Sequence, residues 1–355
     1  MTALQPSSDT SQPWDQILRI LTQNGLRAER NGALGTRTTY RIGGTSAIVV
    51  HVDRATDLQK IAEVVAMHQI TNVMVVGNGS NMLIADNGYN GVAVVLEATG
   101  PDEIFLDSDE SLVASGHLSL PQLARQSVAA GRCGLEWAVG VPGTVGGGVR
   151  MNAGGHGSDM AASIVSANIF DIRHGTGAVV DVADLGLRFR ASALSDDHVV
   201  VSARFVTEKS AIKKGHECAS ELTEIVRWRR EHQPGGQNAG SVFVNPGEGN
   251  QSAGALIDAA GLRGLRHGSA VVTQKHANFI QSDSDGSADD VVALMCQVQE
   301  AVSAHCGVTM RSEIRLVGFG DEISARFMGQ EHHDSTVMAA ASKLEAIVRN
   351  GNLSL

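Results

Sequence analysis

Two glycine-rich clusters interrupt otherwise apolar segments and most constrain how this chain can fold. GNGSN at residues 77–81 directly follows the predicted buried strand 73–76, and VPGTVGGG at residues 141–148 is followed by MNAGG at 151–155. Glycine lets a backbone take positive φ angles and approach a ligand closely, and successive N–H groups on such turns form concave anion sites. Tight turns without a ligand are the alternative, which two clusters this dense disfavour. The clusters therefore predict a cradle for the two phosphates of one dinucleotide.

Neither cluster matches a common nucleotide motif. GxGxxG is absent from both, and GxxxxGK[ST] occurs nowhere in the chain. This argues against an ordinary dinucleotide-dependent dehydrogenase with a Rossmann domain and against a P-loop enzyme.

Composition excludes several classes of function. The formal net charge of −10 over 355 residues disfavours a general nucleic-acid or membrane-surface binder. The first thirteen residues lack the apolar segment of a signal peptide, and no apolar run is long enough to span a bilayer. The four cysteines form no CxxC pair and no zinc spacing, which indicates reduced thiols in a cytoplasmic protein, with Cys133 as a packing residue and no metal site.

Apolar spacing and turn residues divide the chain into three mixed units. We expect a lead-in and helix over 1–25, a strand–helix–strand unit over 26–97, a unit of helices and antiparallel strands over 98–206, a third unit over 207–318 and a tail over 319–355. Thr56 is expected to cap one helix, Ser119 to open another with a capping box, and Ser287 and Gly307 to bound a third. The remaining expected helices cover 14–23, 217–230, 252–260 and 336–348, and the expected strands cover 47–52, 73–76, 91–96, 112–115, 164–172, 178–182, 199–206, 269–272, 277–281 and 313–317.

An ordered set of motifs from about residue 30 to 318 resembles the UDP-N-acetylenolpyruvoylglucosamine reductase family. The motifs are YRIGG at 40–44, the two glycine clusters, FRAS at 189–192, GSVFVNP at 240–246, AGALID at 253–258, GLRG at 261–264, KHANF at 275–279 and SEI at 312–314. The resemblance implies an α+β fold, with a two-subdomain FAD-binding module like that of PCMH and vanillyl-alcohol oxidase proteins and a smaller α+β substrate domain. The short interval between Arg190 and Ser241 resembles the branch of the family that lacks a substrate-capping loop.

The resemblance also implies the ligands. The family holds FAD non-covalently, takes hydride from NADPH and reduces UDP-N-acetylglucosamine enolpyruvate to UDP-N-acetylmuramate for peptidoglycan, and we expect a monomer. The residues that match its FAD-binding segments are Tyr40, Arg41, Ile42, Gly43, Gly77, Asn78, Gly79, Ser80, Asn81, Val141, Pro142, Gly143, Thr144, Gly146, Gly147, Asn152, Ala153 and Gly154.

Three residues far apart in sequence match the family's catalytic positions. Reducing an enol ether that bears a carboxylate needs a proton donor for carbon and groups that stabilise the developing charge on oxygen. Ser241 matches the proton donor, Arg190 the active-site arginine and Glu313 the active-site glutamate. Each also has a plain structural interpretation: a Gly-Ser turn for the serine, a surface ion pair for Arg190, and pairing of Glu313 with Arg311 or Arg315.

The substrate diphosphate is expected to contact Arg227, His232 and Asn245. This sequence departs from the family at His232, where lysine is usual, and at Val244, where a basic residue is common; Ser312 and Phe189 replace a usual proline and tyrosine. Two rival hypotheses remain: another FAD-linked oxidoreductase on the same scaffold, which would lack the three catalytic residues, and a non-catalytic paralogue that binds a sugar nucleotide.

Overall fold

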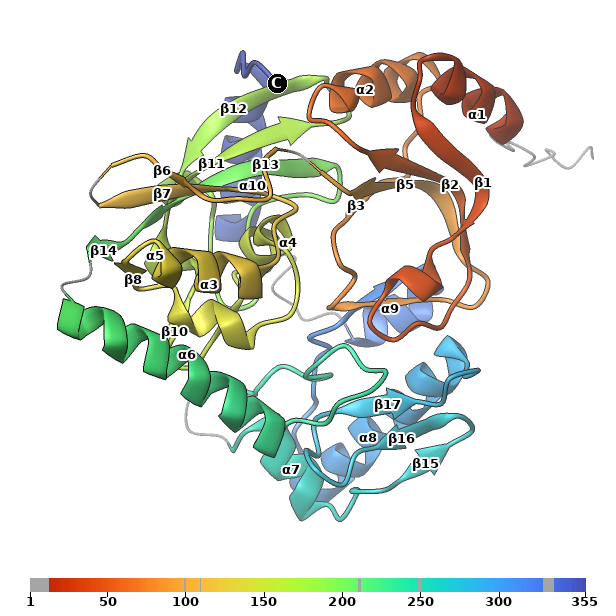
Figure 1. Ribbon diagram of the computed structural model, residues 1–355. Coiled ribbons are helices and arrows are strands. Elements are labelled where there is room, and N and C mark those ends of the chain that lie inside the picture. Colours follow the sequence, from red (N-terminus) through yellow and green to blue (C-terminus); the bar gives the residue numbers. More distant parts are fainter. Residues whose placement is uncertain (1–12, 99, 109, 210–211, 248–250, 328–334) are drawn as a thin grey trace, which may run out of the picture.

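The computed structural model describes residues 13–98, 100–108, 110–209, 212–247, 251–327 and 335–355. These residues form three α+β units and a C-terminal tail (Figure 1), which is the fold class that the sequence predicts. Residues 1–12 of the expected lead-in lie outside the described residues. Within the described part of the chain, no helix is both long and apolar enough to cross a membrane.

The first unit is a four-stranded sheet covered on both faces. The strand order is β1-β2-β5-β3, with β1 antiparallel to β2 and the other pairs parallel. Alternate residues of β2 face opposite ways, so that Ile48 and Val50 pack under α1 and α2 whereas Val49 packs under β4 and β18. The elements are α1 (Trp14–Gln23), β1 (Arg27–Ala33), η1 (Gly35–Arg37), β2 (Thr45–Val52), α2 (Asp57–Met67), β3 (Val73–Val76), β4 (Met82–Ile84) and β5 (Tyr89–Leu96).

Two local expectations for this unit differ from the structure. Thr56 does precede α2, but its hydroxyl makes no capping hydrogen bond; instead the Asp57 carboxylate accepts from the Arg54 N–H at 3.2 Å. Strand β1 was not expected, because its sequence RAERNGA is polar. It lies at the edge of the sheet, where most of its side chains are exposed, so no apolar alternation is needed to form it.

The second unit is built on a five-stranded antiparallel sheet of order β12-β11-β13-β7-β6. Helix α3 begins with the predicted capping box, in which Ser119 and Gln122 satisfy each other's backbone N–H groups. The elements are β6 (Phe105–Leu106), β7 (Ser111–Ser115), α3 (Leu120–Ala129), β8 (Arg132–Cys133), η2 (Glu136–Gly140), α4 (Val145–Arg150), β9 (Gly154–Gly155), β10 (Ser158–Asp159), α5 (Met160–Ser163), β11 (Ile164–Asp171), β12 (Thr176–Asp181), η3 (Val182–Asp184), β13 (His198–Val206) and β14 (Glu208–Lys209).

The third unit follows the long helix α6, which runs from the second unit toward the third (Figure 1). Its helix α8 has the predicted ends: Ser287 accepts from two N–H groups of the first turn, and Gly307 closes the helix with φ 73°. The last two strands are shorter than predicted, which leaves Glu313 in the loop before β18. The elements are α6 (Ile212–His232), α7 (Ala253–Ala259), β15 (Arg266–His267), β16 (Ala270–Val272), β17 (Ile280–Ser282), α8 (Ala288–Cys306) and β18 (Arg315–Val317).

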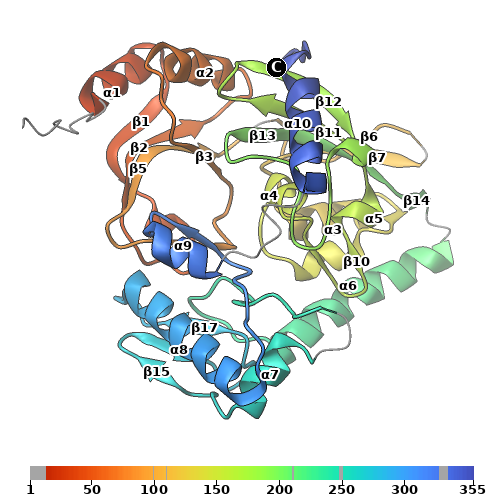
Figure 2. The same cartoon turned by 180° about the vertical axis from the view of Figure 1, so that it is seen from behind.

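The tail adds two helices, α9 (Asp321–Phe327) and α10 (Ser335–Arg349). Figure 2 shows both on the same side of the molecule, α9 next to the third unit and α10 against the sheet of the second. Phe327 of α9 packs 6.3 Å from Phe243, measured between ring centroids. Leu344 and Val348 of α10 have no exposed surface and belong to the core of the second unit. The expected tail helix is therefore present and contributes to that core.

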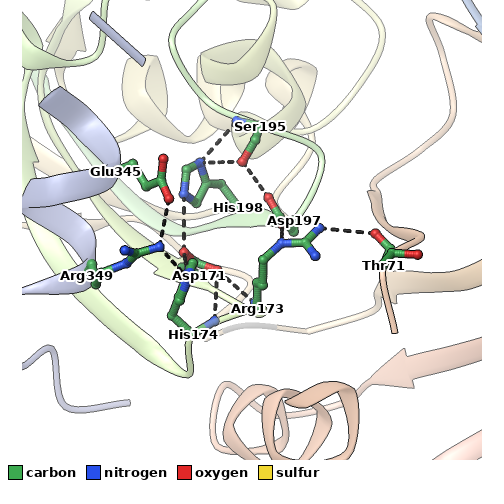
Figure 3. Close-up of polar contacts among 9 residues, drawn as sticks. All are labelled: Thr71, Asp171, Arg173, His174, Ser195, Asp197, His198, Glu345 and Arg349. Carbon is green, nitrogen blue, oxygen red and sulfur yellow. Dashed lines mark hydrogen bonds and ion pairs between the residues drawn. The ribbon is translucent and has the colours of Figure 1, made fainter. Parts of the chain in front are cut away.

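A polar network fixes the end of α10 (Figure 3). Arg349 contacts the His174 ring at 2.6 Å, and the other nitrogen of that ring contacts the Asp171 carboxylate at 2.6 Å. Next to it, Arg173 donates to the Thr71 carbonyl at 3.1 Å. Through these contacts the tail, the second unit and the first unit are held together at one corner.

The cysteines contradict the sequence-based expectation of reduced thiols. Cys133 of β8 and Cys218 of α6 form a disulfide with their Cα atoms 6.1 Å apart, so Cys133 is more than a packing residue. Both are buried, and the Glu136 carboxylate lies within 4.8 Å of the two sulfur atoms. No local spacing could reveal a pair separated by 85 residues. The bond ties α6 to the second unit.

We expect Cys218→Ser to lower the free energy of unfolding by about 2–4 kcal/mol, because the bond closes a long loop and restricts the unfolded chain. Guanidinium unfolding of the FAD-loaded protein measures this. Cys306→Ser, which removes an exposed free thiol, is the matched control and should leave the midpoint unchanged. Two results together would show that the disulfide does not stabilise the fold. Cys218→Ser would unfold at the same midpoint as the wild type, and a phosphine reductant would leave the midpoint of the wild type unchanged.

Candidate active site

A cleft of about 430 Å³ lies where the three units meet. The first unit contributes residues 77–82, the second contributes 140–156 in part, and the third contributes the segment after α6. Arg190, Ser241 and Glu313 all line this one cleft. Residues that are 123 positions apart in sequence are thus brought together by the packing of the units, not by any local motif.

The two glycine clusters meet across the cleft. A Cβ atom on Gly77 would lie 2.6 Å from the Thr144 hydroxyl, and a Cβ on Gly143, whose φ is +124°, would lie 2.8 Å from the Ser80 hydroxyl. Ser80 also donates to the Pro142 carbonyl at 3.1 Å. A side chain at either position would force the neighbouring hydroxyl to shift, and at position 143 it would also be strained by the positive φ.

The first glycine turn has free backbone donors. Among the hydrogen bonds of the described residues, none uses an N–H of residues 77–81 as the donor. Adjacent free N–H groups on a turn that lines a cleft are a site for a phosphate. The glycine contacts and these free donors fit the diphosphate of a dinucleotide.

The expected cofactor residues fall into three groups. Gly77, Asn78, Gly79, Ser80, Asn81, Val141, Pro142, Gly143, Thr144, Gly147, Ala153 and Gly154 line the cleft. Arg41 lines an adjoining cavity of about 910 Å³, which shares Asn78 with the cleft. Tyr40, Ile42, Gly43, Gly146 and Asn152 line none of the described cavities.

The residues away from the cleft support its walls. The Tyr40 hydroxyl is buried and donates to the Ile280 carbonyl at 3.0 Å, which joins the first and third units. The Asn152 side chain donates to the Arg188 carbonyl at 3.1 Å and accepts from the Ala161 N–H at 2.9 Å. Asn152 thereby holds the turn that carries Arg190.

Arg190 and Glu313 form an ion pair with Nε 2.8 Å from a carboxylate oxygen. Arg190 has φ 56°, a conformation held by the reciprocal backbone bonds between Arg188 and Ala191. Glu313 pairs with this arginine and not with Arg311 or Arg315, the two partners that the plain structural interpretation suggested. The two expected catalytic residues are therefore in direct contact.

Backbone contacts fix Glu313 and Ser241 relative to the first glycine turn. The Asn81 side chain donates to the Glu313 carbonyl at 3.0 Å, and the Asn81 carbonyl accepts from the Arg315 N–H at 2.9 Å. Strand β18 continues from there in parallel with β4. The Glu313 N–H donates to the Val242 carbonyl at 2.8 Å, which places Ser241 beside it.

Burial raises the pKa of the Glu313 carboxyl above its ordinary value of 4.5, although the Arg190 guanidinium acts in the opposite direction. A carboxyl in little water loses hydration when it ionises, and one cation compensates only in part. Glu313 thus keeps a proton to higher pH than an exposed glutamate does.

Asp196 is a site residue that the sequence analysis missed. Its carboxylate binds Arg315 at 2.7 Å and Arg150 at 3.4 Å, and its carbonyl accepts from the Val75 N–H at 2.8 Å. The two arginines, which line the cleft, come from different units. Nothing in the local sequence distinguishes Asp196 from any other loop aspartate.

The expected substrate residues lie outside the cleft. Arg227, His232 and Asn245 are exposed and line none of the described cavities. The His232 ring stacks on Trp228 with centroids 4.6 Å apart. Arg229, one turn earlier on α6, does line the cleft and is half-buried.

Comparison with known proteins gives the same picture. Residues 46–181 match a family model described as an FAD binding domain, and residues 232–317 match the C-terminal domain of UDP-N-acetylenolpyruvoylglucosamine reductase. The enzyme of that name from Gloeobacter violaceus is 36% identical over 293 residues, which cover 81% of this chain and 95% of the relative. The chain belongs to the UDP-N-acetylenolpyruvoylglucosamine reductase family.

Solved structures agree with this assignment. The crystal structure of the reductase from Thermus caldophilus is 31% identical and covers 82% of this chain and 99% of its own, with a TM-score of 0.70. A more distant protein, Physcomitrella patens BBE-like 1, has 12% identity and a TM-score of 0.55 over 92% of this chain. The second likeness concerns the fold alone. The FAD-binding family model and the reductase structure together confirm the expected fold class.

We expect Gly143→Ala to reduce the FAD retained on the purified protein, because the methyl group would lie too close to the Ser80 hydroxyl and a residue held in a sparsely populated backbone region costs about 1–3 kcal/mol. Flavin absorbance per protein, before and after dialysis, measures the loss. Gly320→Ala, where the added Cβ meets nothing within 4 Å, is the control. If Gly143→Ala retained all of its FAD, the close packing of residue 143 against Ser80 would not be needed for FAD binding.

We also expect the titration of Glu313 to move further upward in Arg190→Gln, because the guanidinium lowers the carboxyl pKa that burial raises. Carboxyl-carbon NMR of the wild type and the variant measures the shift, with Glu313→Gln to assign the signal. Arg266→Gln, which removes an exposed partner of Asp283, should leave the signal in place. An unchanged Glu313 titration in Arg190→Gln would contradict the ion pair.

Proposed function

We propose that this chain reduces UDP-N-acetylglucosamine enolpyruvate to UDP-N-acetylmuramate with NADPH, as a step of peptidoglycan precursor synthesis. The observation that supports this most is the meeting of Arg190, Ser241 and Glu313 in the same cleft as the two glycine turns. Another FAD-linked oxidoreductase on this scaffold would have no need of that trio.

The glycine turns are proposed to hold FAD without a covalent bond. Residues 77–81 offer free N–H donors, and the 141–144 segment closes on them from the second unit. When bound and reduced by NADPH, FAD supplies the hydride for the substrate double bond.

Ser241 is proposed to give the proton that completes the reduction. Its hydroxyl lines the cleft, and within the described residues it makes no hydrogen bond that would occupy its single proton. A serine hydroxyl is a weak acid, so it acts only on a strongly basic carbon next to it. Gly240, with φ 79°, turns the backbone so that the serine lies at the cleft.

Arg190 and Glu313 are proposed to bind the substrate carboxylate. An arginine fork suits two carboxylate oxygens, and its charge favours the electron-rich intermediate over the ground state. Glu313 orients that fork at 2.8 Å. Its raised pKa also allows a protonated carboxyl to donate a hydrogen bond to a substrate oxygen.

The nucleotide end of the substrate is proposed to lie toward the end of α6. Arg229 is a cation of this helix that lines the cleft. Arg227, His232 and Asn245 remain candidates for the diphosphate on the exposed surface beyond it. The half-buried position of Arg229 lowers its pKa below the ordinary value, which a diphosphate beside it would offset.

Further parts of the proposal concern the setting. We propose that the protein acts as a monomer in the cytoplasm, where nucleotide sugars and NADPH are made, and that its loss impairs cell shape and division through the wall. Disulfides are rare in that compartment. Alkylation of thiols during lysis, followed by mass spectrometry of Cys133 and Cys218, determines the state of this pair in the cell.

An anaerobic absorption experiment tests the proposed reaction. Protein loaded with FAD is reduced with NADPH, and UDP-N-acetylglucosamine enolpyruvate is then added. Bleaching followed by recovery of the flavin bands supports donor, cofactor and acceptor together. Bleaching without recovery would rule out the proposed acceptor. That result would favour another FAD-linked oxidoreductase or a non-catalytic paralogue that binds a sugar nucleotide.

Ser241→Ala should slow the recovery of the flavin bands by about 10²–10⁴-fold, which is the usual contribution of a positioned proton donor. Bleaching by NADPH needs no such proton and should keep its wild-type rate, which makes it an internal control for folding and FAD binding. Equal slowing of both half-reactions would show that Ser241 has a structural role, and an unchanged recovery would exclude it as the donor.

A further inference from the structure

The Cys133–Cys218 pair has a third chemical group beside it. An oxygen of the Glu136 carboxylate and the two sulfur atoms all lie within 4.8 Å of one another, and all three residues are buried. Among the residues that the structure describes, this is the one group of three cysteine, histidine or acidic side chains close enough together to hold a metal ion. We call these three residues the Cys–Glu cluster.

The Glu136 carboxylate is only half satisfied. Its Oε2 atom accepts from the Gly134 N–H at 2.8 Å. Its Oε1 atom is buried and accepts no hydrogen bond from any described residue. A buried oxygen without a partner is costly, and a disulfide has no S–H group that could donate to it. In its oxidised form the cluster therefore lacks a partner for this carboxylate.

A second carboxylate comes from helix α6. Glu221 follows Cys218 by three residues, so that both side chains project from one side of the helix. Partial burial raises the pKa of Glu221 above its ordinary value of 4.5, and the charges of Glu136 and Glu224 add to this effect. Because such repulsion falls with distance, it indicates that Glu221 lies in the neighbourhood of Glu136, where a cation would be favoured.

The Cys–Glu cluster joins two elements that lead to the walls of the active-site cleft. Cys133 and Glu136 shortly precede the second glycine cluster at residues 141–148, and η2, which begins with Glu136, packs against α6. Figure 1 shows β8 beside α6. Farther along α6, Arg229 and Gln233 line the cleft. A bond across the cluster therefore holds the cofactor turn and the cleft side of α6 in one arrangement.

Reduction of the pair makes ligands for a metal ion. A dithiol reductant gives two electrons and two protons to the S–S bond and leaves as its own disulfide, so that Cys133 and Cys218 become thiols. A zinc ion that then binds displaces both thiol protons to water and forms two Zn–S bonds. In a compartment that keeps thiols reduced, the second form of the cluster replaces the first.

We propose that the reduced protein binds one zinc ion between the Cys133 and Cys218 thiolates and the Glu136 carboxylate. Tetrahedral Zn²⁺ with Zn–S distances of about 2.3 Å and Zn–O distances of about 2.1 Å holds neighbouring ligand atoms about 3.6–3.8 Å apart. The three ligand atoms already lie within 4.8 Å of one another, so that rotations of these side chains reach the geometry. Water or the Glu221 carboxylate supplies the fourth ligand.

The zinc ion would keep α6 tied to the second unit when the disulfide is absent. Its carboxylate ligand is the group whose buried oxygen has no partner in the oxidised form. The inference rests on the Cys–Glu cluster alone and holds whichever reaction the cleft catalyses.

Metal loading of the reduced protein tests this. Full-length, FAD-loaded protein is treated with a phosphine, freed of reductant without oxygen and titrated with Zn²⁺ against a coloured chelator, with Co²⁺ as a spectroscopic substitute. The wild type should bind one ion per chain, and the bound Co²⁺ should show the visible bands of a tetrahedral thiolate site at wavelengths beyond those of the flavin. Protein with the disulfide intact should show no such bands.

Glu136→Gln keeps the shape of the side chain and removes its charge. It should weaken zinc binding by at least about tenfold, since even residues that only support a metal ligand contribute that much. Cys218→Ser should abolish the cobalt bands. Glu63→Gln, which changes an exposed glutamate of α2, and Cys306→Ser, which removes an exposed thiol, are the matched controls and should bind zinc as the wild type does. Flavin absorbance and thermal melting verify that each variant is folded.

Three results would overturn the proposal. The first is a reduced wild type that binds no zinc although mass spectrometry shows both cysteines as thiols. The second is a pair that the phosphine does not reduce in the folded protein. The third is equal zinc affinity in the wild type, Glu136→Gln and Cys218→Ser, since that result places the ion elsewhere on the protein.

Discussion

The contact of Asn81 with the segment 313–315 is the interaction on which the site depends. Asn81 ends the first glycine turn, and both its side chain and its carbonyl bond to the backbone around Glu313. Strand β18 then lies in parallel against β4, so the third unit adds to the hydrogen bonding of the first. A catalytic side chain held by such backbone bonds keeps its position relative to the cofactor turn more closely than one held by side-chain packing alone.

Buried charge around the cleft is arranged in pairs that cross between units. Glu313 of the third unit pairs with Arg190 of the second, and Asp196 of the second pairs with Arg315 of the third. Burial acts to raise the pKa of Asp196, but its two arginine partners outweigh burial and the pKa is lowered. Removing one member of such a pair leaves a charge in little water, which is more costly than losing an exposed ion pair. The same contacts thus orient the catalytic groups and fix the units to one another.

Much of the fold follows from local signals in the sequence. The capping box at Ser119, the two ends of α8 and the buried strand before the first glycine turn all rest on chemistry within a few residues. The edge strand β1 could not be predicted from the sequence, because its polar residues show no apolar alternation. The disulfide could not be predicted either, because its two cysteines are 85 residues apart and lie in different elements.

For the site, the glycine clusters could be read from the residues themselves, whereas Arg190, Ser241 and Glu313 came from the family resemblance. Asp196 and Arg150 carried no such signal, because their importance lies in contacts between units. The exposed positions of Arg227, His232 and Asn245 likewise depend on how α6 is oriented. Sequence patterns report the face of an element that is buried, but they do not report which element lies across a cleft.

The position of α10 has a consequence for synthesis on the ribosome. Leu344 and Val348 complete the core of the second unit, whose own strands end at Lys209. Domains that emerge early usually fold before the rest of the chain is made, but the core of the second unit needs two residues of α10, which is made after the whole third unit. Until Leu344 and Val348 have been made, the apolar surface that these two side chains cover stays exposed, and a chain truncated before α10 exposes the same surface.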